Sequence, residues 1–537
     1  MVSVLRYFLI FALLTVLAFG QVARPRFYAD DPIWSVPPPT PVTEVKKRDI
    51  DALYDFMWQS FRPQGKKPAP SRGINTLGEV PDSEWFTNRH AKKRMTSDEL
   101  KRGPGNQNSP VAPYRVVGAK TEGITPGFNI RDAQNRLYFV KIDPRSNPEM
   151  STAADVIGSK FFYALGYYTP ENYILNAQRE QLTVADDAKV EVAGKERQLN
   201  SKDLDLILDH VPRRKDGSYR LLASLAVKGA PIGPFRYEGT RRDDPNDVVP
   251  HDVRRDLRGL YVFCAWLNHT DSKAGNTLDA VVEENGIKFV RHYLIDFGAT
   301  LGSDSDMPKN ARFGHEYIFP DRSEALKAIA SLGLYTRDWE RADYPSHLKA
   351  VGRFEAKTFD PTTWRSNYPN PAFLSRLPED EYWAAKQVMA FTNEDIRATV
   401  ETGQFSDPRV VDYLVATLAE RRDKIGRAFL SDVLPLDNFR ISGNEIAFDD
   451  LASKHGFSPQ RQYRFRWFLF DNRSGTQTSV PGARPQLPSN LTTSDANVYL
   501  ATEISAASGS DKSVTVYLRR AGETWSPVGI DRKGAEK

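Results

Sequence analysis

Alternating apolar and polar positions predict a run of β-strands in the first half of the chain, beginning at residue 114. A helical pattern from Pro148 to about Leu165 interrupts them, and Gly166 and Pro170 supply the stop signals expected beyond its end. The expected strands span residues 114–119, 127–131, 137–142, 172–177, 182–192 and 219–227. We therefore expect a sheet with one helix inserted between its strands.

Helical periodicity dominates from residue 250 onward, after a glycine and proline segment at 229–233 that is typical of a hinge. The expected helices span residues 250–268, 324–333, 379–390, 393–402 and 408–433. After the first of these, residues 277–294 are expected to form a β-hairpin that turns at Glu284, Asn285 and Gly286. Strands first and helices second predict an α+β fold.

Alternation returns near the carboxyl terminus, at residues 463–470, 498–504 and 513–519. It predicts a small C-terminal β domain, interpreted as a sandwich. Trp525 and Tyr517 in this region could contact sugars. They could also fill the core of the domain, which is the more frequent role of aromatic residues on alternating strands.

The amino terminus has the pattern of a signal peptide, residues 1–20, with Arg6 before an apolar run at 7–19 and cleavage expected after Gly20. The run is shorter than the roughly 20 residues that span a bilayer. The alternative is an uncleaved membrane anchor. We expect a secreted or periplasmic protein, membrane-anchored if the signal is retained, with no transmembrane span after signal removal.

The remaining domain boundaries follow from composition and periodicity. Residues 21–50 are expected to be a proline-rich linker, and residues 51–113 an N-terminal extension that begins with a short helix. Residues 114–233 form the strand-rich part, 234–435 the helix-rich part and 436–537 the C-terminal β domain.

The composition excludes several classes of protein. Of the 537 residues, 40% are hydrophobic, so the chain can build sizeable cores and is not disordered. A formal charge of +4, from 73 basic and 69 acidic residues, gives no indication of nucleic-acid binding. Cys264 is the only cysteine, which makes an intramolecular disulfide impossible, and we expect it to be buried. No cysteine pair has the spacing of a zinc site.

Two motifs flank the expected hairpin and carry most of the candidate chemistry. The first is H-T-D-S-K-A-G-N at residues 269–276, and the second is L-I-D-F-G at residues 294–298. They supply two carboxylates, Asp271 and Asp296, and Asn276 adds a neutral oxygen that can hold a magnesium ion together with Asp296. Metal-binding oxygens and one well-placed carboxylate are what phosphoryl transfer requires, although Asp and Asn also cap turns.

Lys141 lies near the end of the third expected strand and needs an acidic partner if it is to be a fixed charge. Glu149, at the start of the next helix, is the predicted partner because it shares a helical stripe with Ala153 and Ile157. Asp155 lies off that stripe and is the second candidate. Glu149 could instead interact favourably with the amino terminus of the helix.

Glycines bracket the first expected hairpin at Gly118, Gly123 and Gly127. Their backbone amides could cover the phosphates of a nucleotide. The spacing is not G-x-G-x-x-G, and the geometry of hairpin turns also explains glycine at such positions.

The chain resembles the protein-kinase-like superfamily over about residues 114–433. The resemblance lies in the order of its features, which is a strand lysine, a helix carboxylate, a hinge, a helix, H-x-D-x-K-x-x-N and D-F-G. The resemblance implies a two-lobed fold, with an antiparallel β N-lobe, a mostly α C-lobe and a cleft for ATP and magnesium or manganese. It implies that Asp271 accepts the proton of the acceptor hydroxyl and that Lys273 steadies the transferred phosphate. The remaining implied roles are nucleotide binding by Lys141, Glu149, Gly123 and Gly127, and metal binding by Asn276 and Asp296.

The chain departs from the ordinary protein-kinase pattern at two places. Thr270 replaces the arginine of H-R-D, and no A-P-E follows D-F-G. These departures argue against the usual reading of a phosphorylated activation loop and against a peptide-docking platform of the ordinary kind. The signal peptide points to the atypical and secretory-pathway branches of the superfamily.

The sequence supports three functional hypotheses. The leading one is a secreted, magnesium-dependent phosphotransferase that moves the γ-phosphate of ATP to a hydroxyl on a protein or glycan. The second is a non-enzymatic, kinase-like scaffold whose C-terminal β domain binds a partner or a polysaccharide. The third, phosphorylation of a small molecule, shares the leading chemistry, and nothing in the sequence identifies the acceptor.

Overall fold

The computed structural model describes residues 24–63, 68–105, 108–120, 127–192, 195–319, 330–331, 336–488, 497–509 and 511–533. The expected signal peptide, Gly123 and most of the helix expected at 324–333 lie outside the described residues. The described residues form two compact units. The smaller unit comprises 24–33, 75–79 and 433–533, and the larger unit comprises 34–74 and 80–432 apart from the gaps.

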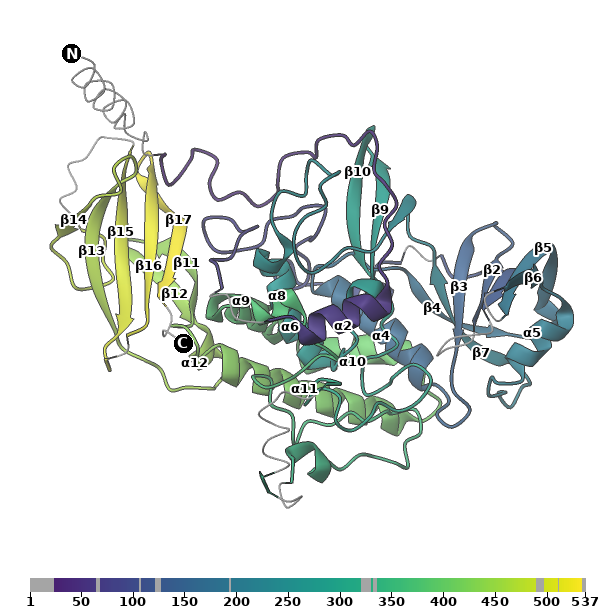
Figure 1. The fold of residues 1–537 in the computed structure, drawn as a ribbon. Helices are drawn as coiled ribbons and strands as arrows, with labels where there is room; N and C mark the ends of the chain where they lie inside the picture. The colour runs from purple at the N-terminus through teal and green to yellow at the C-terminus, as the bar shows by residue number, and fades with distance from the viewer. Residues whose placement is uncertain are drawn as a thin grey trace, which may run out of the picture. The chain divides into compact units, whose positions relative to one another are not determined.

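The larger unit contains a seven-stranded sheet in the order β4-β7-β3-β2-β1-β5-β6 (Figure 1). Its strands are β1 (Tyr114–Lys120), β2 (Gly127–Arg131), β3 (Leu137–Ile142), β4 (Asn172–Ala177), β5 (Leu182–Val192), β6 (Lys195–Gln198) and β7 (Tyr219–Leu225). Neighbouring strands are antiparallel except β1 and β5. The six strands expected from the alternating pattern are all present, and the mixed content agrees with the predicted α+β class.

The alternation of β3 explains where Lys141 lies. Tyr138, Val140 and Ile142 are buried in the core of this sheet. Because successive side chains of a strand point to opposite faces, Lys141 lies on the other face. The helix α4 (Met150–Ala164) contacts β3, β4 and β7.

The rest of the larger unit is mostly helical. Its helices are α2 (Ala52–Phe61), α3 (Ser97–Arg102), α5 (Ser201–Leu208), α6 (Arg255–Leu267), α8 (Pro371–Leu374), α9 (Pro378–Met389), α10 (Asn393–Val400) and α11 (Pro408–Phe429). Single 3₁₀ turns are η1 (Arg179–Gln181), η2 (His251–Val253), η3 (Ala274–Asn276), η4 (Asp338–Arg341) and η5 (Glu401–Gly403). The helix expected at 250–268 begins later than predicted, because Arg254 is extended and separates η2 from α6.

The hairpin is β9 (Thr277–Glu284) and β10 (Ile287–Leu294), as predicted. Asn285 and Gly286, with φ of 50° and 77°, form its turn. The segment at 229–233 differs from the expected hinge, because it includes the strand β8 (Ala230–Gly233), which pairs antiparallel with β9.

Part of the expected proline-rich linker is bound to this hairpin region. The backbone amide of Val42 donates to the carbonyl oxygen of Lys288 at 2.8 Å, and that of Arg48 donates to Ile232 at 2.9 Å. Residues 34–50 are therefore part of the larger unit. In the part of the chain that the structure describes, no helix is both long enough and apolar enough to cross a membrane.

The smaller unit contains a five-stranded antiparallel sheet in the order β14-β13-β15-β16-β17 and the hairpin β11-β12. Its elements are β11 (Leu436–Ser442), β12 (Glu445–Asp450), α12 (Leu451–Lys454), β13 (Tyr463–Asp471), β14 (Gln477–Val480), β15 (Val498–Ala506), β16 (Ser513–Ala521) and β17 (Thr524–Lys533). Tyr517 is buried, and its hydroxyl donates to Asp531 at 3.0 Å. Trp525 is half-buried against the core. Both aromatic side chains thus contribute to packing, the more frequent of their two predicted roles.

Substitution of Asp380 tests how much the buried ion pairs of the larger unit contribute to its stability. The Asp380 carboxylate is fully buried and binds Arg255 at 2.9 Å and Arg258 at 3.5 Å. We expect Asp380→Ala to lower the free energy of unfolding by about 3–5 kcal/mol, because it removes the buried carboxylate that neutralises two buried guanidinium groups. Asp412→Ala removes the exposed partner of Arg397 and should cost less than about 1 kcal/mol. Urea unfolding of both variants measures the difference, and equal losses would contradict this account.

Candidate active site

The hairpin β9–β10 brings the two sequence motifs together. The first motif precedes β9 and the second follows β10, and Thr277 pairs with Leu294 at the open end of the hairpin. The backbone amide of Ile295 also donates to the carbonyl oxygen of Asn276 at 3.0 Å. The motif residues that are 20 positions apart in the sequence, Asn276 and Asp296, are therefore neighbours in space.

One lysine amine joins three segments at this site. Lys141 Nζ on β3 lies 2.9 Å from Asp155 Oδ2 on α4 and 2.7 Å from Asp296 Oδ1 after β10. Asp155 Oδ1 accepts further hydrogen bonds from the side chain of Asn172 at 2.9 Å and the backbone amide of Phe297 at 3.2 Å. Asp155 is thus a buried connector between the sheet, the helix and the D-F-G segment.

Burial and charge act against each other in this trio. Burial by itself would lower the pKa of the Lys141 amine, but Asp155 and Asp296 outweigh it and raise that pKa above its usual value. Burial raises the pKa of Asp155, with Lys141 opposing the rise. Burial also acts to raise the pKa of Asp296, but Lys141 prevails and lowers it. Lys141 and Asp296 therefore stabilise each other in their charged forms.

Glu149 is not the partner of Lys141, and this prediction is wrong. The helix begins at Met150, and Glu149 precedes it with a φ of 68°, so the spacing of the helical stripe does not apply to it. Its carboxylate accepts hydrogen bonds from the backbone amide of Ser406 at 2.8 Å and from its hydroxyl at 3.0 Å. The second candidate, Asp155, occupies the predicted position.

Asp271 is held by three donors from its surroundings. Its Oδ2 lies 2.9 Å from the amine of Lys273 and accepts a hydrogen bond from Asn276 Nδ2, also at 2.9 Å. Its Oδ1 accepts from Asn367 Nδ2 at 3.3 Å. The carboxylate is fixed but keeps part of its surface exposed, 23% of the side chain.

Asn276 and Asp296 have the oxygen ligands that a hard divalent cation needs. The amide nitrogen of Asn276 is committed to Asp271, which fixes the orientation of the amide, and no donor among the described residues bonds to its side-chain oxygen. The side chain of Asp296 is 41% exposed. In the described part of the chain no group of three or more His, Cys, Asp or Glu could hold a metal by itself. These two oxygen ligands would need phosphate and water oxygens beside them.

The glycines near this face are less informative. Gly123 lies outside the described residues. Gly127 pairs with Lys141 across β2 and β3, and a Cβ at Gly127 would lie 2.6 Å from the carbonyl oxygen of Val140. Close packing of the strands therefore explains this glycine without a bound ligand.

Apolar packing fixes the D-F-G segment beneath α4. Phe297 is fully buried and stacks on Phe162 with ring centroids 5.1 Å apart. The ring of His269 lies 5.6 Å from that of Phe162. Burial lowers the pKa of His269 to about 4, so its imidazole is neutral at physiological pH. His269 thus acts as a packing residue beneath the site.

The end of α6 is anchored so that the first motif has a fixed starting point. Asn268 ends the helix with a φ of 52°, and its side-chain oxygen accepts from Trp364 Nε1 at 2.9 Å. The buried Arg421 donates to the carbonyl oxygens of Ala265 at 2.6 Å and Trp266 at 2.9 Å. A cation at the carboxyl end of a helix satisfies its free carbonyls and favours its dipole. Burial also raises the pKa of Cys264 in this helix to about 12, in agreement with the predicted buried thiol.

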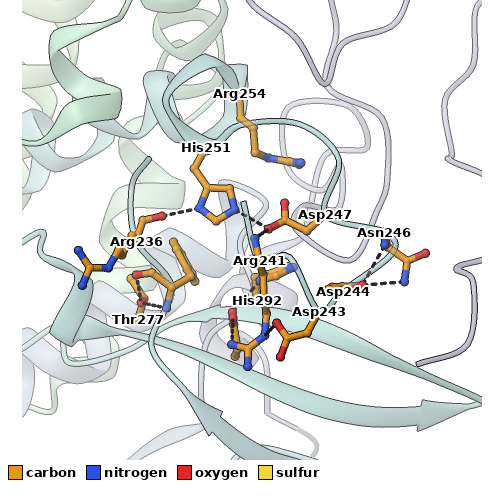
Figure 2. A network of polar contacts seen from close by, with 12 residues as sticks. Arg236, Arg241, Asp243, Asp244, Asn246, Asp247, His251, Arg254, Thr277 and His292 are labelled. Atoms are coloured by element: carbon orange, nitrogen blue, oxygen red, sulfur yellow. Dashed lines mark hydrogen bonds and ion pairs between the residues drawn. The ribbon is translucent and has the colours of Figure 1, made fainter. Parts of the chain in front are cut away.

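A buried polar network supports the hairpin from the side of residues 234–254. Figure 2 shows Arg241, Asp247, His251 and His292 within this network. Arg241 Nη1 lies 3.0 Å from Asp279 Oδ2, and His292 Nδ1 lies 2.7 Å from the other oxygen of the same carboxylate. His251 Nε2 lies 2.9 Å from Asp247 Oδ2. Asp279 belongs to β9 and His292 to β10, so these contacts fix the two strands between the motifs.

Asn367 is a site residue that the sequence did not identify. Its backbone amide donates to the carbonyl oxygen of Thr270 at 2.8 Å, in addition to its side-chain contact with Asp271. It lies 96 positions after Asp271, in a segment with no recognisable motif. Only the folded chain reveals this contact.

No protein-family model matches the chain, and no curated protein matches it. Among solved structures, the chain is similar to one described as the crystal structure of a Helicobacter pylori proinflammatory kinase CtkA. The sequence identity is 12% and the TM-score is 0.30, with 59% of this chain and 92% of that chain covered.

Proposed function

We propose that this protein is a secreted phosphotransferase with a kinase-like, two-lobed body, which moves the γ-phosphate of ATP to a hydroxyl on a protein or glycan with the help of magnesium or manganese. The observation that carries the proposal is the position of the Lys141 amine, 2.9 Å from Asp155 and 2.7 Å from Asp296. A strand lysine fixed by a helix carboxylate, next to a D-F-G aspartate, is the arrangement that grips nucleotide phosphates in kinases.

Each residue then has a role that its surroundings support. Lys141 neutralises charge on the nucleotide phosphates, and Asp155 keeps its amine in place. Asp296 and the side-chain oxygen of Asn276, which accepts no hydrogen bond from a described residue, are the ligands for the divalent ion. The ion, when bound with the nucleotide, supplies the charge neutralisation that phosphoryl transfer needs.

Asp271 is suited to receive the proton of the acceptor hydroxyl. Its carboxylate is partly exposed, and the donors Lys273 and Asn367 hold its two oxygens in one orientation. Lys273 is 34% exposed and can reach a phosphate beside Asp271. Orientation of the acceptor and stabilisation of charge account for most of the catalysis in this reaction class.

Nucleotide binding is the first test. We expect ATP with magnesium to raise the melting temperature of the purified protein, since a ligand that binds only the folded state stabilises it. Asp296→Asn should abolish the magnesium-dependent part of this shift, because it removes the charged metal ligand. Glu283→Gln, an exposed carboxylate at the opposite end of the same hairpin, should leave the shift unchanged. A wild-type protein with no shift at millimolar ATP would end the proposal.

Glu149, which precedes α4, and Asp155, which lies within α4, give a matched comparison of two carboxylates. Asp155→Asn should weaken the affinity for ATP by about tenfold or more, because one charged hydrogen bond is worth about 1.5–3 kcal/mol. Glu149→Gln should change the affinity less than about twofold, because Glu149 binds Ser406 instead. Titration calorimetry measures both. A larger effect of Glu149→Gln would contradict the assignment of Asp155.

Asp271 is tested by the reaction itself. We expect Asp271→Asn to lower the rate of transfer of labelled γ-phosphate by about 10²–10⁴-fold, the usual contribution of a general base. The affinity for ATP should stay nearly unchanged, because Asp271 faces the acceptor. A variant that keeps the wild-type rate would exclude Asp271 from this role.

A further inference from the structure

Lys309 is a fully buried lysine beside the candidate active site, in the segment that follows the D-F-G motif. Its amine donates to the hydroxyl oxygen of Thr270 at 2.6 Å and to the carbonyl oxygen of Ala299 at 3.0 Å. Thr270 directly precedes Asp271, and Ala299 lies three residues after Asp296. The amine therefore connects the two loops that carry the candidate functional residues.

Both acceptors of this amine are neutral oxygens. Within the described residues no carboxylate lies at ion-pairing distance from Lys309, in contrast to Lys141 and Lys273. Burial lowers the pKa of Lys309 to about 8, although Asp304 and Asp271 act in the opposite direction. A buried ammonium held by neutral partners is unfavourable for the stability of the fold. This cost suggests a role in the site beyond packing.

The main chain around Lys309 is also tied down. Its backbone amide donates to the carbonyl oxygen of Gly302 at 2.8 Å, and its carbonyl oxygen accepts from Arg353 Nη1 at 3.1 Å. The same Gly302 oxygen accepts from the backbone amide of Arg353 at 2.9 Å. The segment at 299–309 thus forms a closed loop that presents the amine to the interior, and the position of the amine is well defined.

We propose that Lys309 is a positioning residue for the transfer reaction: its amine holds the loop of Asp271 and the loop of Asp296 at their working separation. The role rests on the proposed function. Asp271 and Asp296 lie on different loops, and the hairpin fixes only the end of the first loop and the start of the second. Lys309 adds a side-chain connection on the far side of the motifs, where the backbone amide of Leu301 also donates to the carbonyl oxygen of Leu267 at 2.8 Å and His269 Nδ1 lies 3.5 Å from the Ala299 oxygen. A displacement of about 1 Å between reacting groups can lower a rate by about 10²-fold, so such a connection matters for the rate.

The test uses the full chain and separates the rate of reaction from nucleotide binding. Lys309→Met keeps the length of the side chain and removes its charge and donors, while Thr270→Val removes only the acceptor hydroxyl. We expect each variant to lower kcat, by about 10- to 100-fold for Lys309→Met and less for Thr270→Val. The KM for ATP and the ATP-dependent thermal shift should stay within about threefold of wild type, because neither residue faces the nucleotide. A purely structural role would lower the melting temperature without this selective loss of kcat.

Lys349→Met is the matched control, because Lys349 is an exposed lysine of the same unit. It should keep kcat within about twofold of wild type. A folded Lys309→Met variant with wild-type kcat would overturn the proposal. If Lys309→Met does not fold, Thr270→Val decides, and wild-type kcat in that variant would overturn it as well. Wild-type protein that shows no transfer would overturn the proposed function and this role together, whereas active wild type with unaffected variants would overturn only the role.

Discussion

The amine of Lys141, placed between the carboxylates of Asp155 and Asp296, is the interaction on which the candidate site depends. It joins β3, α4 and the segment after β10. These three elements are separate in the sequence, and none of them contains the first motif. Desolvation of charged groups such as these costs several kcal/mol per ion, and the attraction between the amine and the carboxylates offsets much of this cost. The contribution of the trio to stability is therefore modest. Its main consequence is geometric, since a strand, a helix and a loop must meet at one point.

A second set of constraints brings Asp271 to the same place. Arg421 and Asn268 fix the end of α6, and the hairpin β9–β10 returns the chain to its starting point. The network around Asp279 and His292 holds the two strands from outside. The candidate site thus lies where these two sets of constraints meet, at the open end of the hairpin.

The sequence predicts the parts of this arrangement that depend on local chemistry. The alternating pattern predicts the strand β3 with Lys141 near its end, and the Asn285-Gly286 turn sets the register of the hairpin, so both were predictable. The pairing of Lys141 was not, because it depends on where α4 begins. A helix starting at Pro148 would place Glu149 on the inner stripe, but the left-handed conformation of Glu149 delays the helix and removes it from that face.

Contacts between distant segments were beyond the sequence for a different reason. Asn367 reaches Asp271 across 96 positions and Lys309 reaches Thr270 across 39, and neither lies in a periodic pattern or a motif. The strand β8 is a similar case. Its glycine and proline composition favours a flexible connection, and only pairing with β9 makes it a strand. Local propensity is a weak guide where a tertiary partner decides the outcome.

The charges at the site provide a physical reason for its dependence on a divalent ion under the proposed function. Lys141 is paired with Asp155 and Asp296, and Lys273 with Asp271, whereas the amine of Lys309 donates to two neutral oxygens. A nucleoside triphosphate would add several negative charges to this site, where the lysines are already engaged by protein oxygens. A divalent cation that enters with the nucleotide would offset part of this charge, and Asp296 and Asn276 offer it two oxygen ligands. Under the proposed function the ion therefore binds together with the nucleotide, whose phosphate oxygens complete its set of ligands.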